Sequence, residues 1–600
     1  MDAVLDAVKH VTTLVDSVIW NEYVLFFILG TGILFTIWSR FCQYRAMTHG
    51  VQVVRGRYDD KSDPGAINHL QALSAALSAT VGLGNIGGVA GAIALGGPGA
   101  VFWMWIIGII GMALKTFEVS LAMMFRNTDD PENPHGGAMW VADRAFPLMS
   151  PKLATFGKIV GVLFCITLLI SSITGGNMYQ AWNVAEITQK SFAVPRIVCG
   201  VGLSILCGMV IIGGIKSIGR VAGFLVPFMC LIYMAAGIVV ILIKITVIPE
   251  MFALIFESAF SEKKAGGAFL GATFYYGFSW GMRRALFSNE AGQGSAPIAH
   301  AAAKTDEPIR EGIVAGLGPF IDTLVVCTIT ALIILSTGAW NRAPDVHLQQ
   351  SNFPASFLTE LQDTKAKEKL ILKLPEREEF SSNPDKWKPG ARTFFVVEAQ
   401  TDANTNRKLH RVSGDVKRGF LEKDEEEQFW VELGANESKA EDPVLYVVWE
   451  RKKFEESPKF HFEDEGIPLY IDYPSVTLTG HAFDLVIPGL GKWMIPIAAW
   501  LFALSTMISW SYYGEQGVIY MFGSNPYMVT FYRIVYCLLI VVATLGIVKN
   551  DEDLGLYTSL GTGVMLVVNL PICLIFGNRA MKAYFEYVRK LKAGEFRKNW

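Results

Sequence analysis

Charged residues are scarce in this chain, and those present are unevenly distributed. They make up 18% of the 600 residues, whereas hydrophobic residues make up 52% and the mean hydropathy is +0.35. Residues 341–487 hold 48 charged residues in 147, and the other 453 residues hold only 59. So little charge excludes a water-soluble body, and so much charge excludes the segment 341–487 from lipid. The chain therefore combines a membrane body with a soluble insert.

Motifs of enzymes, metal sites and nucleic-acid binding are also missing. No cysteine spacing typical of a metal site occurs, and the eight cysteines lie in or beside apolar runs, as small buried residues do. No basic tract with interleaved aromatic residues occurs, which argues against nucleic-acid partners. The insert contains no P-loop, no nucleophile–base pair and no metal-ligand constellation. We therefore predict that the protein is not an enzyme and has no cofactor.

Eleven apolar runs are long enough to cross a membrane, whose ~30 Å hydrocarbon core needs about 20 apolar residues per helix. They lie at 20–39, 67–95, 98–125, 156–185, 194–214, 221–246, 268–297, 312–339, 488–522, 527–548 and 555–577. The first 19 residues carry a helical stripe of valines and leucines, and lack the basic start of a signal peptide. They are expected to form a helix on the membrane surface.

Two of the runs contain glycines that interrupt a helix. The second has five glycines within Gly82–Gly91, and the seventh has glycines spread over Gly271–Gly294. Each glycine costs a helix about 1 kcal/mol relative to alanine, and unpaired backbone in a membrane needs protein or a water-filled cavity around it. Close helix packing is the simpler interpretation of one such run. Two breaks that open two inverted sets of five spans instead predict a binding site at the membrane midplane.

The loops assign a side to each end of the chain. If the eleven runs alternate, most Lys and Arg residues of the loops and of the C-terminal tail fall on one side. The positive-inside rule then places the C-terminus in the cytoplasm, and the N-terminus and the insert outside, in a cell (inner) membrane. The predicted domains are 1–19 (surface segment), 20–66 (extra span and cytoplasmic linker), 67–250 (first repeat), 251–340 (start of the second repeat), 341–487 (insert), 488–578 (rest of the second repeat) and 579–600 (basic tail).

The insert is predicted to be a small β-rich fold. Short runs of β-branched and aromatic residues, bounded by turn residues, occur at Thr393–Val397, Phe429–Leu433, Val444–Trp449 and Tyr470–Tyr473. Three roles stay open for it: a lid, a docking surface for an unknown partner, or a passive addition.

A broken span offers backbone groups of both polarities to a ligand. Carbonyl ends suit Na⁺ or an ammonium group and N–H ends suit a carboxylate, so an amino acid fits without charged side chains. The ninth run adds adjacent hydroxyls at Ser505 and Thr506, which can complete an oxygen shell for a hard cation. The alternative is that both hydroxyls bond back to carbonyls of their own helix.

Ionisable residues inside apolar runs are functional candidates by default. Arg284 and Glu290 lie in the seventh run and Asp322 in the eighth. They are expected to form an internal charge network that holds the bundle, or alternatively a cytoplasmic gate. Lys115 and Glu118, three residues apart, are expected to be a local pair at the membrane interface.

Several of these segments resemble the alanine/glycine:cation symporter family, the sodium:alanine symporters. The resemblance is most specific at Gly96–Gly111 and Phe287–His300. It is supported by Gly176–Gln180, Gly213–Ala222 and Trp510–Glu515. It covers nearly all of the membrane body and leaves the insert out.

The resemblance implies an all-α polytopic membrane protein with a leucine-transporter-like 5+5 inverted repeat plus one extra N-terminal helix. It also implies uptake of alanine, glycine or a similar small amino acid, driven by Na⁺ or H⁺. By motif position, the substrate would contact Thr80, Gly82, Gly84, Asn85, Gln180, Trp280, Met282, Thr506 and Trp510. Na⁺ would bind at Ala79, Gly82, Ser505 and Thr506.

The sequence thus predicts secondary active transport, with an amino acid, Na⁺ and the lipid bilayer as partners. One Na⁺ crossing 100 mV releases ~2.3 kcal/mol, enough to concentrate a neutral amino acid. No carboxylate lies within either glycine break, which favours Na⁺ over H⁺ as the coupling ion. The alternatives are an H⁺-coupled version, or an ion-conducting or sensor protein whose insert is a receptor module.

Overall fold

The computed structural model describes residues 18–596 except 61, 262–273, 365, 367–368, 376–386, 388, 400–407, 424–427, 433–443, 455, 463–465, 474–475 and 546–550. The chain forms two compact units. The membrane unit comprises Met1–Phe260, Phe274–Thr337 and Ser475–Trp600, and the insert unit comprises Ser261–Thr273 and Gly338–Pro474. Most of the predicted surface segment 1–19 lies outside the described residues.

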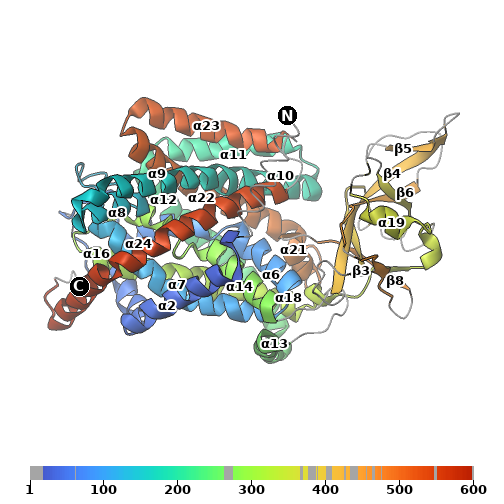
Figure 1. Cartoon of the computed structure of the whole chain (residues 1–600), viewed down its shortest axis with the longest axis horizontal. Coiled ribbons are helices and arrows are strands. Elements are labelled where there is room, and N and C mark those ends of the chain that lie inside the picture. Colours follow the sequence, from blue (N-terminus) through green and yellow to red (C-terminus); the bar gives the residue numbers. More distant parts are fainter. Residues whose placement is uncertain are drawn as a thin grey trace. The chain divides into compact units, whose positions relative to one another are not determined.

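The membrane unit is built of helices (Figure 1). Its first part contains α2 (Glu22–Trp38), α3 (Cys42–Arg45), η1 (Ala46–Gly50), α4 (Val51–Val54), α5 (His69–Thr80), η2 (Gly84–Gly88), α6 (Val89–Gly96), α7 (Gly99–Met124), α8 (Ala138–Ala145), η3 (Phe146–Leu148), η4 (Pro151–Leu153), α9 (Ala154–Ile173), η5 (Thr174–Met178), α10 (Tyr179–Phe192), α11 (Arg196–Ile211), α12 (Gly214–Ile243), η6 (Ile245–Val247) and α13 (Ile248–Phe260). Its second part contains α14 (Phe274–Asn289), α15 (Ala296–His300), α16 (Pro308–Ala315), α17 (Leu317–Pro319), η7 (Phe320–Cys327), α18 (Thr328–Ser336), α21 (Val476–Asp484), α22 (Leu490–Phe522), α23 (Pro526–Thr544) and α24 (Asp551–Ala593).

Among the described residues, seven helices are long and apolar enough to cross a membrane, or up to nine if each of two bent pairs is one span. The chain is therefore a polytopic membrane protein. The pair Glu22–Trp38 with Cys42–Val54 bends by 68°, and the pair His69–Thr80 with Gly84–Gly96 bends by 54°. The second bend falls at the glycines of the second predicted run.

Two of the eleven predicted runs do not reach the length of a span in the described residues. The fifth corresponds to α11, an apolar helix of 16 residues. The seventh starts in residues outside the described ones and continues as α14.

The glycines of the seventh run have two different roles. α14 is continuous through Gly277 and Gly281, and its interruption is confined to residues 290–295, before α15. A Cβ added to Gly281 would lie 2.4 Å from the carbonyl oxygen of Ala100. This glycine therefore permits close packing of α14 on α7, which is the simpler interpretation that the sequence left open.

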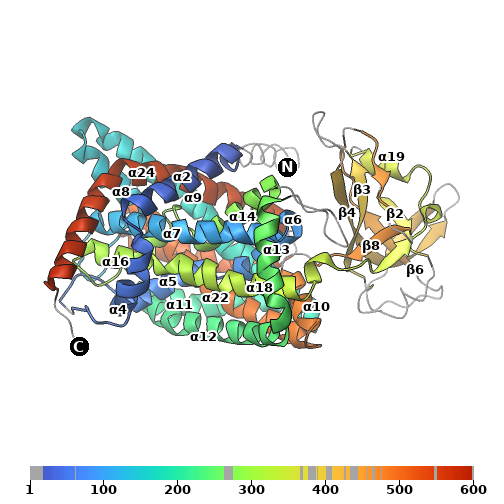
Figure 2. The same cartoon turned by 90° about the horizontal axis from the view of Figure 1, so that it is seen from below.

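Local caps and neighbours fix the helices that carry the site. α5 begins at a capping box, in which Asn68 Oδ1 accepts from the N–H of Gln71 at 2.9 Å and Gln71 Oε1 accepts from the N–H of Asn68 at 3.2 Å. α7 packs against α2, α13, α14 and α16, and Figure 2 shows it running between other helices of the unit. α11 and α23 lie side by side at one edge of the unit (Figure 1). As a result of the contacts of α7, every residue of its second half, from Ile110 to Met123, is buried.

The insert unit contains one sheet. Its strands are β1 (Val346–Leu348), β2 (Leu370–Lys373), β3 (Arg392–Ala399), β4 (Lys408–Lys423), β5 (Gln428–Glu432), β6 (Val444–Trp449), β7 (Lys459–Phe460) and β8 (Ile467–Ile471). The order is β1-β8-β3-β4-β6-β2, with β5 paired to β4 and β7 paired to β3. The unit also has η8 (Ala339–Asn341), η9 (Gln350–Asn352) and α19 (Phe357–Gln362), and its apolar core includes Phe357, Phe395 and Trp449.

The strands follow the runs expected for the insert with small shifts. β3, β5 and β6 overlap the first three of those runs, and β8 ends at Ile471, two residues before the fourth run does. α21, within the stretch that the sequence placed in the insert, packs in the membrane unit. The sequence placed the C-terminal end of the insert at residue 487 because charged residues are dense up to that point. The compact insert unit ends at Pro474.

Candidate functional site

The first break lies between α5 and η2, where the ladder of helical hydrogen bonds stops. α5 ends at Thr80, and Val81 has an extended backbone with ψ of 92°. The N–H of Gly82 donates to Asn85 Oδ1 at 2.8 Å instead of continuing the ladder. The Asn85 side chain therefore holds the unwound turn in place.

The break faces α22 at two adjacent hydroxyl residues. Ser78 Oγ donates to the carbonyl oxygen of Ser505 at 2.7 Å, which joins the two helices. Ser505 Oγ bonds back to the carbonyl oxygen of Phe502 at 2.9 Å. Thr506 Oγ1 has no hydrogen-bond partner among the described residues, and a Cβ added to Gly82 would lie 2.8 Å from it. One hydroxyl thus bonds to its own helix and the other does not.

This contact brings the cation candidates to one place. Ala79 and Gly82 belong to the end of α5 and the turn after it, and Ser505 and Thr506 belong to the facing turn of α22. All are buried, with the Thr506 side chain 3% exposed. Backbone carbonyls of an unwound segment together with a hydroxyl form the kind of oxygen shell that binds Na⁺ in transporters.

Gln180 and Trp510, two of the substrate candidates, lie on facing helices. A Cβ added to Gly176, one turn before Gln180, would lie 2.3 Å from Trp510 Cβ. Gln180 Nε2 donates to the carbonyl oxygen of Gly175 at 3.0 Å, whereas Oε1 has no partner among the described residues. A buried amide oxygen without a donor is suited to accept a hydrogen bond from a ligand.

The remaining substrate candidates are spread over α5, η2 and α14. The Thr80 hydroxyl bonds back within α5 at 3.3 Å. Gly84 packs against α14, and Trp280 packs against the end of α6. Met282 is completely buried. Because Trp280 and Met282 are two residues apart in a continuous helix, they point to different sides of α14.

Asp322 is a completely buried carboxylate at the junction of the two broken spans. Asn85 Nδ2 donates to its Oδ1, and Ser288 Oγ lies 3.0 Å from both of its oxygens. Thr323 Oγ1 donates to its Oδ2 at 2.9 Å. All these donors are neutral. The sequence expectation that no carboxylate lies within either break is wrong: Glu290 lies in the second break, between α14 and α15, and Asp322 reaches the first break from another span.

The three residues expected to form a charge network lie in different surroundings. Arg284 packs along the glycines of η2 and α6, with its guanidinium 5.6 Å from the centre of the Trp280 ring. Glu290 and Asp322 are both within electrostatic range of Lys115. Lys115, which the sequence assigned elsewhere, therefore interacts electrostatically with both carboxylates.

Lys115 and Glu118 attract one another, as their spacing predicts, but the prediction that they lie at the membrane interface is wrong. They are only 1% and 2% exposed, because neighbouring helices cover both faces of this half of α7. Lys115 Nζ donates to the carbonyl oxygen of Asn289 at 2.6 Å, and Glu118 Oε2 accepts from the N–H of Gly294 at 3.3 Å. Backbone groups of the second break replace water as their partners.

A second buried cluster escaped sequence reasoning. The imidazoles of His69 and His300 each place Nδ1 against a different oxygen of Glu311, and none of the three residues is more than 1% exposed. The cluster joins the start of α5 to α15 and α16. The ionisable residues were visible in the sequence, but 242 positions separate His69 from Glu311, and no local pattern links them.

Arg126, just after α7, connects the loops beside this cluster. Its Nη1 lies 2.9 Å from the carbonyl oxygens of both Ala301 and Ala303. In the adjoining loop, burial raises the pKa of the Asp63 carboxyl, and Arg310 at 3.8 Å opposes this shift. Polar contacts therefore join the loops at the end of the membrane unit where α5 begins.

α21 also contacts the first broken span, at η2. Thr479 Oγ1 donates to the carbonyl oxygen of Ile86 in η2 at 3.1 Å. A Cβ added to Gly491 would lie 2.0 Å from the carbonyl oxygen of Gly480, so α21 packs tightly against α22. The broken span is thus held between polar contacts on both sides.

A polytopic membrane fold in which one span unwinds beside unpartnered buried oxygens is typical of membrane transporters. The model of the sodium:alanine symporter family matches residues 5–364 and 470–599, and the chain belongs to this family. It is therefore a transporter and not an enzyme. The family match stops at 364 and resumes at 470, so most of the insert sheet lies outside it.

Similar proteins carry related names. The chain is 42% identical over 334 residues to the sodium/alanine symporter AgcS of Methanococcus maripaludis, covering 56% of this chain and 72% of that protein. It is 37% identical over 326 residues to YrbD of Bacillus subtilis, provisionally named a sodium/proton-dependent alanine carrier protein, covering 54% and 64%. It is 35% identical over 333 residues to GlnT of the same organism, provisionally named a sodium/glutamine symporter, covering 56% and 66%.

Proposed function

We propose that the protein is a Na⁺-coupled symporter of small neutral amino acids, such as alanine or glycine, that works by alternating access. Membership of the family supports cation-coupled symport of an amino acid. The observation that carries Na⁺ is the buried, unpartnered hydroxyl of Thr506 against the unwound turn at Gly82. Neutral oxygens from an unwound segment and a facing helix are the ligands that Na⁺ takes in such carriers.

The proposed architecture is a 5+5 inverted repeat preceded by one extra helix, with eleven spans in total. The repeats would be residues 67–250 and residues 251–340 with 488–578. The bend between α5 and α6 and the interruption after α14 support this proposal, because they open the two sets. Arg284, Glu290 and Asp322 would hold the two sets together or form part of the gate.

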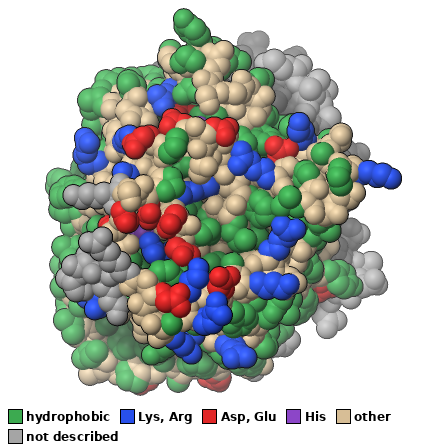
Figure 3. All heavy atoms as spheres, turned by 90° about the vertical axis from the view of Figure 1, so that its left-hand side faces the viewer, with side chains coloured by type: hydrophobic (Ala, Val, Ile, Leu, Met, Phe, Trp, Pro, Cys, Tyr) green, Lys and Arg blue, Asp and Glu red, His purple; other side chains and the backbone are tan. Residues whose placement is uncertain are grey.

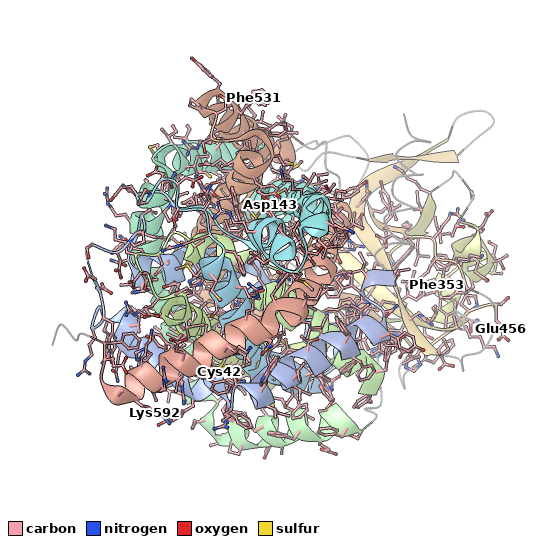
Figure 4. The ribbon with its side chains drawn as sticks, turned by 60° about the vertical axis from the view of Figure 1, so that its left-hand side comes forward. Cys42, Asp143, Phe353, Glu456, Phe531 and Lys592 are labelled. Carbon is pink, nitrogen blue, oxygen red and sulfur yellow. The ribbon has the colours of Figure 1, made fainter. Side chains whose placement is uncertain are left out.

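The proposed orientation has the C-terminus in the cytoplasm, and the N-terminus and insert outside, in the cell (inner) membrane. Charged side chains gather on the face of the molecule seen in Figure 3. The labelled Lys592 marks the last turn of α24 in Figure 4, and the labelled Asp143 belongs to α8. Charge gathered at one end of a helical membrane unit supports the assignment of that end to an aqueous compartment.

The proposed substrate pocket lies between the first break and α10, α14 and α22. The amino acid carboxylate would meet N–H groups of the unwound turn, and its ammonium would meet the unpartnered Oε1 of Gln180. The tight approach of Trp510 to Gly176 would keep the substrate small. The full set of proposed contacts is Thr80, Gly82, Gly84, Asn85, Gln180, Trp280, Met282, Thr506 and Trp510.

A second candidate is coupling to H⁺, and one observation favours it. Asp322 places a carboxylate against the first break with only neutral hydrogen-bond donors around it. A carboxylate in the interior of a membrane protein is a group that can carry a proton through a transport cycle. The name of the relative YrbD includes both ions.

Uptake of labelled alanine into proteoliposomes tests these proposals. We expect accumulation under an inward Na⁺ gradient and none under an equal K⁺ gradient. Competition by glycine, D-alanine and glutamine would then rank the substrates. Accumulation driven by a proton gradient without Na⁺ would favour the second candidate. Failure of every small amino acid under both gradients would contradict symport of this substrate class.

The insert is proposed to be dispensable for transport, whereas α21 is not. β1 pairs with β8 at Val346 and Leu469, so the two ends of the sheet lie together and a short Gly–Ser link can replace residues 346–469. We expect this deletion to keep Na⁺-driven uptake. A deletion extended to residue 487 removes α21 and the bond from Thr479 to η2, and is expected to lose uptake. Equal uptake by both deletions would contradict the role of α21.

A further inference from the structure

The second break differs from the first because two side chains of α7 fill it. Residues 290–295 separate α14 from α15. Such a break leaves carbonyl oxygens at the end of one helix and N–H groups ahead of the next without helical partners. A Cβ added to Gly111 of α7 would lie 3.1 Å from Ala291 Cβ, so α7 lies directly against the break. Lys115 and Glu118 follow on α7, one and two turns further along.

Lys115 occupies the carbonyl end of the break. Its Nζ donates at 2.6 Å to the carbonyl oxygen of Asn289, the last residue of α14. The carboxylates of Glu290, Glu118 and Asp322 are the charged groups that act on it. An ammonium group at a helix C-terminus is stabilised by the partial negative charge of the terminal carbonyls.

Glu118 occupies the N–H end of the break. Its Oε2 accepts from the N–H of Gly294 at 3.3 Å and from Asn569 Nδ2 at 3.0 Å. The N–H of Gly292 is near enough to act on the carboxylate as well. The backbone here is left-handed at Glu290, Gly292 and Gly294, with φ of 53°, 83° and 80°. Such turns direct successive N–H groups into one concavity that binds an anion.

We infer that Lys115 and Glu118 together act as an internal zwitterion that closes the second break. Their ammonium and carboxylate groups meet the carbonyl end and the N–H end, which is where the two charges of a bound amino acid would go. Both breaks keep unpartnered buried oxygens among the described residues, Thr506 Oγ1 at the first and Glu118 Oε1 and Gln293 Oε1 at the second. Because charged side chains already occupy both ends of the second break, we assign the substrate to the first. One part of this inference, the assignment of the substrate to the first break, rests on the proposed function. The other part, that the pair closes the second break, does not.

The pair thus has a positioning role: it keeps α14 and α15 in place during transport. It ties the end of α14 to the backbone just before α15, through the carbonyl oxygen of Asn289 and the N–H of Gly294. The polarity of the pair matters, and not only its presence, because each charge faces backbone dipoles of the opposite sign.

Exchanging the two residues tests polarity at constant composition. The swap Lys115→Glu/Glu118→Lys keeps net charge but turns each charge against backbone groups of like sign. The neutral double variant Lys115→Met/Glu118→Gln removes both charges, and Lys158→Met on the exposed part of α9 is the matched control. We expect Na⁺-driven alanine uptake to fall at least about 10-fold in the neutral variant and further in the swap, since 1.4 kcal/mol is a tenfold change.

Thermal unfolding of the purified full-length variants gives a second readout that needs no substrate. We expect the swap to have a lower Tm than the neutral variant, and Lys158→Met to match the parent. A swap that equals or exceeds the neutral variant in Tm and uptake would overturn the inference. If the parent fails to transport alanine, the proposed function fails, while the order of Tm values still decides the inference.

Two further measurements keep the inference testable if the swap does not fold. Lys115→Arg retains a cationic donor for the carbonyl of Asn289, so we expect it to transport at least about 10-fold faster than Lys115→Met. Equal rates would overturn the inference. Equilibrium binding of labelled alanine to the purified parent should saturate at one molecule per chain, and a second equivalent would show that the second break is open.

Discussion

Replacing Thr506 with alanine is expected to lower the apparent Na⁺ affinity of alanine uptake by about 10- to 100-fold. The hydroxyl is buried against Gly82 and has no hydrogen-bond partner among the described residues, so its removal breaks no bond within the protein. Interaction of a polar group with a charge contributes about 1.5–3 kcal/mol, and 1.4 kcal/mol is a factor of ten. The measurement is the Na⁺ concentration that gives half-maximal uptake into proteoliposomes.

Two hydroxyl variants of the same helix are the controls. Thr506→Ser keeps the oxygen, and we expect its Na⁺ affinity to stay within a factor of about three of the parent, less than 1 kcal/mol. Ser511→Ala removes a hydroxyl that bonds back to the carbonyl oxygen of Ile508 at 2.7 Å, so Na⁺ affinity should not change. Unchanged Na⁺ affinity in Thr506→Ala would remove this residue from the proposed cation site.

The first break was predictable because its signals are local. Five glycines within Gly82–Gly91 weaken one span, and the hydroxyls of Ser505 and Thr506 are visible as a pair in an apolar run. What each hydroxyl does was not predictable. Ser505 bonds back to its own helix and Thr506 does not, and this difference depends on the position of a turn about 420 residues away in the chain.

A glycine in an apolar run can permit close helix packing or interrupt the helix, and a single sequence does not distinguish these two roles. Gly281 lets α14 pack on α7 without interrupting it, whereas Gly292 and Gly294 occupy left-handed positions in a true break. Both roles need a missing Cβ, either for space or for backbone freedom. Only the neighbouring helix, which the sequence does not name, distinguishes them.

The buried ionisable residues were visible, but their partners were not. Lys115 and Glu118 read as an i,i+3 pair, because that spacing is the only relation that one sequence offers. Their actual partners lie about 175 positions away, in the backbone of the second break. The cluster of His69, His300 and Glu311 was missed for the same reason. Helix neighbours in a bundle are a property of the fold and not of local periodicity.

Replacing Asp322 with asparagine is expected to reduce alanine accumulation by at least about 100-fold, equivalent to 2.8 kcal/mol or more. The side chain keeps its shape but loses its charge and one of two acceptor oxygens. Asn85, Ser288 and Thr323 then share one acceptor oxygen in place of two, and a buried donor left without an acceptor costs about 1–3 kcal/mol. Steady-state accumulation in proteoliposomes under a Na⁺ gradient, and separately under a proton gradient, measures the effect.

Exchange of alanine across the membrane without any ion gradient separates the two roles open to Asp322. If Asp322 carries the coupling charge, the neutral variant should still exchange internal for external alanine while it fails to accumulate it. If Asp322 only holds Asn85 and Ser288 in place, exchange and accumulation should fall together. Asp129→Asn, on an exposed loop, is the matched control and should change neither. Accumulation by Asp322→Asn within a factor of about three of the parent, less than 1 kcal/mol, would contradict both roles. In that case the contacts of Asn85 to this carboxylate would be incidental to transport.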